Sequence, residues 1–235
     1  MHGAFFSYII KKKFLHLRPA LPKLTTEQGN FMRWQFKIAL ATVPMVLLMG
    51  AAVGFTNKSA HALDESEKSA FVEQIVAYLK GENVDMREDK LKAVIHTVCD
   101  QSKQHDLDYR LALAVIKVES NFNHDVVSRK GARGLFQIKP SLAKYIARDA
   151  GVTWDGTQCL QEPDKNIKLG IYHLSKLVED FKNLPTALHA YNAGASKAKA
   201  RRDGKGEPKS AFTKRVLKEY RNNIAVLPEM DESDR

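Results

Sequence analysis

A glutamate interrupts an apolar helical stripe near the middle of the chain. Ala112, Val115, Ile116 and Glu119 are spaced so that they share one face of a helix predicted over 108–119. A carboxyl group among apolar side chains is poorly solvated, which raises its pKa. Such an acid can keep a proton near neutral pH and donate it to a leaving oxygen, so this position is a candidate general acid.

A structural interpretation of Glu119 stays open beside the catalytic one. A glutamate at the end of a helix can also extend its carboxylate into water. It can pair with a nearby cation, and the sequence offers Arg110, Lys117 and Arg133 for that role. The helix alone does not separate these alternatives.

The sequence that follows Glu119 gives it a context. It contains, in order, SNFN (120–123), Ser128, GARGLFQIKP (131–140), NIKLG (166–170) and AYNAG (190–194). From His105 to Tyr220 the chain resembles the soluble lytic transglycosylase family, whose catalytic domain is goose-lysozyme-like. Several separate blocks in the right order make the resemblance specific, whereas any one of them would be weak.

The resemblance implies a reaction for Glu119. It would protonate the glycosidic oxygen between N-acetylmuramic acid and N-acetylglucosamine, and then accept the proton of the C6 hydroxyl that closes a 1,6-anhydro ring. Ordinary glycosidases need two carboxylates. Here the intramolecular hydroxyl and the N-acetyl group of the substrate can replace the second, and Asp125, the nearest acid, is given no role.

The resemblance also implies a set of substrate-binding residues. Ser128 would hydrogen-bond the N-acetyl group or Glu119, and Gln137 would line the groove. Phe136 stands where relatives often have methionine and would keep an apolar wall. Tyr191 would reach toward the catalytic acid, and Asn192 would support the site.

Each of these residues has a structural alternative. Ser128 can be a turn serine, and Gln137 can satisfy backbone groups of its loop. Tyr191 can be a core aromatic residue, and Asn192 can belong to a helix C-cap. Tyr220 could also face the groove from the last helix.

The elements that must position these residues are mainly helical, and no strong alternating β pattern appears. We expect a lysozyme-like helical domain with a substrate groove. Gly and Pro residues predict a loop-rich middle over 131–156, and the basic stretch Lys197–Ser210 is interpreted as a further loop. The predicted helices cover residues 64–80, 87–104, 108–119, 164–182, 185–194 and 211–222.

The N-terminus has the pattern of an export signal. An uncharged apolar run over 38–55 follows Arg33 and Lys37 and precedes the small-x-small sequence at 60–62. Cleavage is favoured, and an uncleaved membrane anchor is the alternative. Met32 opens a normal signal sequence, so we expect the chain to start there rather than carry a long cytoplasmic tail.

These patterns divide the chain into four parts. They are a leader (1–62), a helical N-terminal extension (63–104), the catalytic domain (105–222) and a C-terminal tail (223–235). The whole chain has a formal net charge of +10, but the leader holds eight Lys/Arg and one acid, which leaves about +3 for the rest. A nucleic-acid partner is therefore not expected.

No cofactor is predicted. The histidines after the leader lack metal-ligand spacing, and the Asp/Asn residues at 121–125 lack the acidic pattern of a calcium loop. Cys99 and Cys159 are the only cysteines, and either a disulfide or two thiols fits an exported protein.

We therefore expect an exported, periplasmic peptidoglycan lytic transglycosylase, anchored in the inner membrane if the leader is retained. We expect it to bind the glycan strand and not nucleic acid. We also expect the protein to be a monomer. A link to cell-wall or secretion machinery stays open. A lysozyme-type hydrolase and a non-catalytic wall-binding module are the alternatives.

Overall fold

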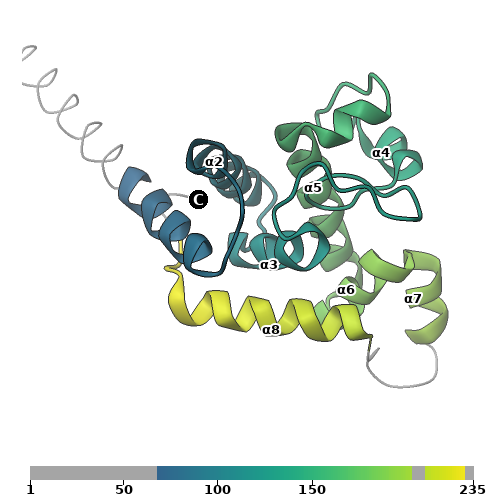
Figure 1. The fold of residues 1–235 in the computed structure, drawn as a ribbon. Coiled ribbons are helices and arrows are strands. Elements are labelled where there is room, and N and C mark those ends of the chain that lie inside the picture. The colour runs from purple at the N-terminus through teal and green to yellow at the C-terminus, as the bar shows by residue number, and fades with distance from the viewer. Residues whose placement is uncertain (1–67, 203–209, 231–235) are drawn as a thin grey trace, which may run out of the picture. The chain divides into compact units, whose positions relative to one another are not determined.

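The computed structural model describes residues 68–202 and 210–230, which form helices joined by loops (Figure 1). No strand forms within these two ranges, where two isolated bridges, Val127–Arg133 and Arg133–Ile138, occur instead. The predicted mainly α fold is thus confirmed. The leader 1–62, the start at Met32 and the end of the tail (231–235) lie outside the described residues.

The described chain consists of a succession of helices. A first helix covers residues 68–81. It is followed by α2 (Glu88–Gln104), α3 (Tyr109–Ser120), α4 (Pro140–Ile146), the 3₁₀ helix η2 (Thr157–Gln161), α5 (Pro163–Phe181), α6 (Leu184–Ala193), α7 (Ala195–Arg202) and α8 (Ala211–Val226). In this part of the chain no helix has the length and apolar character that a membrane crossing requires.

Helix α3 is the central element. Every residue from Leu111 to Ile116 is buried, because α3 packs against α2 on one side and α8 on another (Figure 1). Its first turn is fixed by Asp108, whose side chain accepts a hydrogen bond from the backbone N–H of Arg110 at 2.9 Å. It ends at Asn121, which adopts the left-handed conformation with φ 49°. These two caps place Glu119 in the last turn.

The loop-rich middle of the chain departs from the prediction at its centre. Residues 140–146 form α4, with Pro140 in the first turn, where a missing N–H does no harm. The stretch 157–161 is the short helix η2. The proline that we interpreted as part of a loop is therefore the start of a helix.

The C-terminal third also contains more helix than predicted. Residues 195–202 form α7, although Lys197–Ser210 was expected to be a loop, and residues 203–209 lie outside the described ranges. Ala198 is buried against α5 and α6, and this packing stabilises a helix that a basic sequence does not signal. Helix α8 runs to Val226 rather than ending at 222.

The two cysteines are not bridged. Cys159 is buried in η2 and Cys99 is half-buried in α2, and no disulfide joins them in the described chain. The sequence allowed either a disulfide or two thiols, and the structure contains two thiols.

Candidate active site

Glu119 is half-buried at the C-terminal end of α3. Burial raises the pKa of its carboxyl from 4.5 to about 7, and the positive charge of Arg215 opposes part of that rise. The carboxyl therefore holds a proton over a large part of the neutral range, which is the property required of a general acid.

The pairing alternative for Glu119 does not occur. Arg110 binds Asp108 at the other end of α3, at 2.9 Å, and the ammonium group of Lys117 donates to the carbonyl of Glu82. In the part of the chain that the structure describes, no hydrogen bond or salt bridge engages the carboxyl of Glu119. Arg215 of α8, which the sequence did not single out, is the cation that acts on it.

Tyr191 lies close enough to Glu119 for the charge of the acid to act on its hydroxyl. The pKa of Tyr191 is raised well above 10, mainly by burial and also by the charge of Glu119. Its hydroxyl donates to the backbone carbonyl of Phe136 at 2.6 Å, and its ring stacks on Phe212 at a centroid distance of 6.2 Å. Tyr191 thus connects α6, α8 and the loop before α4 beside the acid.

Helix α6 holds Tyr191 in place through its own caps. The side chain of Asn183 accepts a hydrogen bond from the N–H of Thr186 at 2.9 Å, which fixes the start of the helix. The helix ends at Gly194, whose φ is 96°. The sequence AYNAG is therefore a helix end, with Tyr191 on its last turn.

The loop between α3 and α4 carries two predicted substrate-binding residues. Gln137 adopts a left-handed backbone with φ 49°, and its amide nitrogen donates to the carbonyls of Val126 and Gly134 at 3.0 and 2.9 Å. The hydroxyl of Ser128 accepts from the N–H of Ala132 at 3.0 Å. Both side chains therefore shape the loop, and the Gln137 carbonyl oxygen and the Ser128 hydroxyl proton are the groups left to meet a ligand.

Phe136 contributes to the site through its backbone. Its side chain is 0% exposed, so it lies in the core rather than on a surface wall. A Cβ added at Gly170 of α5 would come within 2.1 Å of the ring, which shows how closely the ring packs on that helix. The Phe136 carbonyl is what the Tyr191 hydroxyl binds.

Asn166 of α5 fixes this loop and is a residue whose role the sequence did not indicate. Its buried amide accepts from the N–H of Phe136 at 2.7 Å and donates to the carbonyls of Leu160 and Arg133 at 2.8 and 3.0 Å. A Cβ at Gly134 would meet this amide at 2.3 Å. The blocks NIKLG and GARGLFQIKP are therefore two halves of one packed unit that positions the Phe136 carbonyl.

Asn192 and Tyr220 contribute less to the surroundings of Glu119. Asn192 is exposed on α6, next to Tyr191. Tyr220 does not face the acid, because its hydroxyl donates to Asp108 at 2.8 Å, at the opposite end of α3 from Glu119.

The described residues offer no obvious metal site. No group of three or more His, Cys, Asp or Glu among them could hold an ion. His173 lies 5.5 Å from the Tyr191 ring, and burial lowers its pKa to about 4, so it is neutral at pH 7. The arrangement offers a carboxylic acid with a pKa of about 7, a half-buried tyrosine and the side-chain amide of Gln137 in the loop.

Comparisons with known proteins agree with this arrangement. Residues 97–212 match the family described as the transglycosylase SLT domain. A soluble lytic murein transglycosylase of Salmonella typhimurium is 33% identical over 96 residues, which cover 40% of this chain and 15% of that protein. An endo-type membrane-bound lytic murein transglycosylase A of Klebsiella pneumoniae is 40% identical over 75 residues, covering 30% of this chain and 36% of the relative.

The fold also matches solved structures. A lytic transglycosylase of Pseudomonas aeruginosa, solved as an inactive mutant with glutamine in place of a glutamate, superposes with a TM-score of 0.51 at 27% identity. The match covers 60% of this chain and 26% of that one. The predicted lysozyme-like fold class is thus confirmed, while this chain spans only a minor part of the length of each of these proteins.

Proposed function

This chain belongs to the transglycosylase SLT domain family, and from that membership and the Glu119 site we propose that it is a peptidoglycan lytic transglycosylase. The single observation that carries the proposal is a half-buried carboxyl at the end of α3 with a pKa of about 7, next to a half-buried tyrosine. An inactive glutamate-to-glutamine mutant of a relative supports the need for one glutamate in that enzyme.

In the proposed reaction Glu119 acts first as an acid and then as a base. Its proton passes to the glycosidic oxygen between N-acetylmuramic acid and N-acetylglucosamine as the bond to C1 breaks. The C6 hydroxyl oxygen of the same muramic acid then bonds to C1, and its proton returns to Glu119. No water is consumed, so the product carries a 1,6-anhydro ring and the enzyme is restored.

The electrostatics around Glu119 favour this route over hydrolysis. A hydrolase of the two-carboxylate type places a second acid within about 5–10 Å, and its charge would raise the pKa of the first. The pKa of Glu119 is shifted by burial and by the cation Arg215, without a contribution from another carboxylate of the described chain. A carboxylate oxygen of Asp125, the next acid along the sequence, lies 3.1 Å from Nδ1 of His124.

The neighbouring residues have positioning roles in this proposal. Tyr191 shields the acid from water and holds the loop through the Phe136 carbonyl. The Gln137 carbonyl oxygen and the Ser128 hydroxyl would bind acetamido groups of the sugar, and Asn192 would contact the strand from α6. We further propose that the protein acts in the cell envelope, exported by its leader.

Digestion of purified peptidoglycan by the full-length chain tests the proposal. Mass spectrometry should find muramic acid ends that are one water lighter than hydrolysis products. Glu119→Gln should abolish their release, and the matched control Asp125→Asn should leave it intact. Reducing ends would instead indicate the hydrolase, and binding without any cleavage would indicate a wall-binding module.

A further inference from the structure

The charged residues of the described chain are distributed unevenly. Residues 126–147 contain lysines and arginines but no acid, and the same holds for the described residues from Lys182 to Lys218. The salt bridges lie elsewhere, within 73–110, 148–179 and at 229, apart from the pair His124–Asp125. The described part of the molecule therefore has one region where cations are balanced by acids and one where they are not.

The segments of the unbalanced region are linked to one another, and two of their residues, Tyr191 and Arg215, interact electrostatically with Glu119. The loop before α4 is bound to α6 through Tyr191 and Phe136, and α6 packs against both α7 and α8. Phe212, on the first turn of α8, stacks on Tyr191. Arg215, three residues further along α8, is the cation whose charge acts on Glu119.

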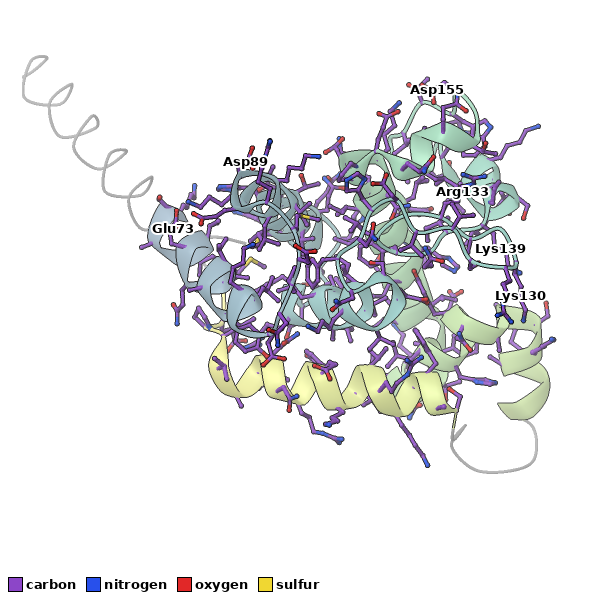
Figure 2. All side chains as sticks on the ribbon, viewed as in Figure 1. Glu73, Asp89, Lys130, Arg133, Lys139 and Asp155 are labelled. Carbon is purple, nitrogen blue, oxygen red and sulfur yellow. The ribbon has the colours of Figure 1, made fainter. Side chains whose placement is uncertain are left out.

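Four exposed cations from these segments define what we call the cationic rim. They are Lys130 and Lys139 of the loop, Lys197 of α7 and Arg215 of α8. None of the four forms a salt bridge within the described residues. In Figure 2, Lys130 and Lys139 leave the loop at the end nearest α6 and α7. Unpaired exposed cations around a site attract anionic ligands and repel cationic ones.

We propose that the cationic rim binds the carboxylates of the peptide stems that the glycan strand carries beside the scissile bond. This inference rests on the proposed function, because it takes the strand to be the ligand at Glu119. The lactyl carboxyl of each stem-bearing muramic acid is held in the amide bond to its stem, so the stem carboxylates supply the negative charge that the rim would meet. A strand held by its stems on both the loop and α7 would be oriented across the end of α3.

Binding of the Glu119→Gln full-length chain to soluble, stem-bearing glycan strands tests this without cleavage. The matched ligand is the same strand with its stem carboxylates converted to amides. We expect the charged strand to bind more tightly at low salt. Replacing Lys130, Lys139 and Lys197 together with glutamine should reduce that preference by roughly tenfold, since each exposed ion pair contributes a few-fold in affinity. High salt should reduce it similarly.

A control variant separates this effect from overall charge. Lys90, Lys103 and Arg221 are also exposed, form no salt bridge in the described chain and lie outside the rim. Their triple replacement with glutamine should leave the preference for the charged strand unchanged. An equal loss in the two triple variants would overturn the proposal, as would equal binding of charged and amidated strands.

Two further measurements keep the alternatives apart. The first is binding to mixed-sequence duplex DNA. If the chain bound DNA more tightly than the charged strand, and lost that binding when the rim lysines were replaced, the rim would be assigned to nucleic acid and the proposal contradicted. The second is cleavage of peptidoglycan by the chain with Glu119 intact, which tests the proposed function separately. If that cleavage fails while the charge preference persists and depends on the rim, the function is wrong and the stem contact stands.

Discussion

Replacing Asn166 with leucine should destabilise the protein through the loop that it holds. The two side chains have similar size, but leucine cannot make the hydrogen bonds that Asn166 makes at 2.7, 2.8 and 3.0 Å. A buried backbone group that loses its partner costs about 1–3 kcal/mol. Two such groups lose their partner here, the Phe136 N–H and the Leu160 carbonyl, whereas the Arg133 carbonyl keeps the N–H of Ile138 at 3.0 Å. Because the loop can relax and admit water, we expect roughly 2–4 kcal/mol in total.

Urea denaturation followed by circular dichroism measures this change. Asn222→Leu is the matched control, because Asn222 is exposed on α8 and has no hydrogen bond to its side chain among those the structure describes. Its replacement should change the free energy of unfolding by less than about 0.5 kcal/mol. If Asn166→Leu destabilised the protein no more than this control, the idea that Asn166 fixes the loop would be wrong.

Three other changes follow from the same contacts. Glu119→Gln should stabilise the protein by up to about 3 kcal/mol at pH 8 and hardly at all at pH 4. Folding raises the pKa of Glu119 from 4.5 to about 7, so the contribution of this residue to stability falls as the pH rises through that window. Equal thermal shifts of the variant at both pH values would contradict this. Gly170→Ala should cost about 1–3 kcal/mol because its Cβ would approach the Phe136 ring to 2.1 Å, and Phe136→Leu in the same chain should recover part of the loss in a double-mutant cycle. Tyr191→Phe removes the 2.6 Å hydrogen bond to the loop and should lower the free energy of unfolding by about 1 kcal/mol. It should also lower the rate of peptidoglycan cleavage under conditions where the variant stays folded. A loss of stability without a loss of cleavage would argue against the positioning role of Tyr191.

The helices that carry the site were predictable because each has a strong local signal. Helix α3 shows three apolar residues and one acid on a single stripe, and its cap Asp108 is a good helix starter. Helix α5 starts at a proline and ends at Phe181, one residue from the predicted boundary. In both, periodicity and caps agree with the packing.

Helices α4 and α7 were missed because tertiary packing decides them. The short α4 starts at Pro140, which reads equally well as a loop residue. Helix α7 has a basic sequence, and its helical form depends on the burial of Ala198 against α5 and α6. A single sequence does not show which neighbours a weak helix will find.

Within the candidate site, the sequence indicated the acid and Tyr191 but not the residue that fixes the loop. Glu119 broke an apolar pattern, and the blocks that follow it gave the catalytic interpretation its support. The bonds of Asn166 to Phe136, Leu160 and Arg133 join segments up to 33 residues apart, and no local pattern reports them. Phe136 looked like a wall of the groove because its type is apolar, and only the structure shows that its ring packs on Gly170 instead.

Direct titration of Glu119 tests the central claim, which is that this carboxyl keeps its proton near neutral pH. Carbon-13 NMR of the glutamate side chains, with Glu119→Gln used to assign the signal, would follow its ionisation in the folded chain. The structure predicts a midpoint of about pH 7. A midpoint near 4.5, the value of a glutamate in water, would show that the carboxyl is solvated and would contradict its role as the acid.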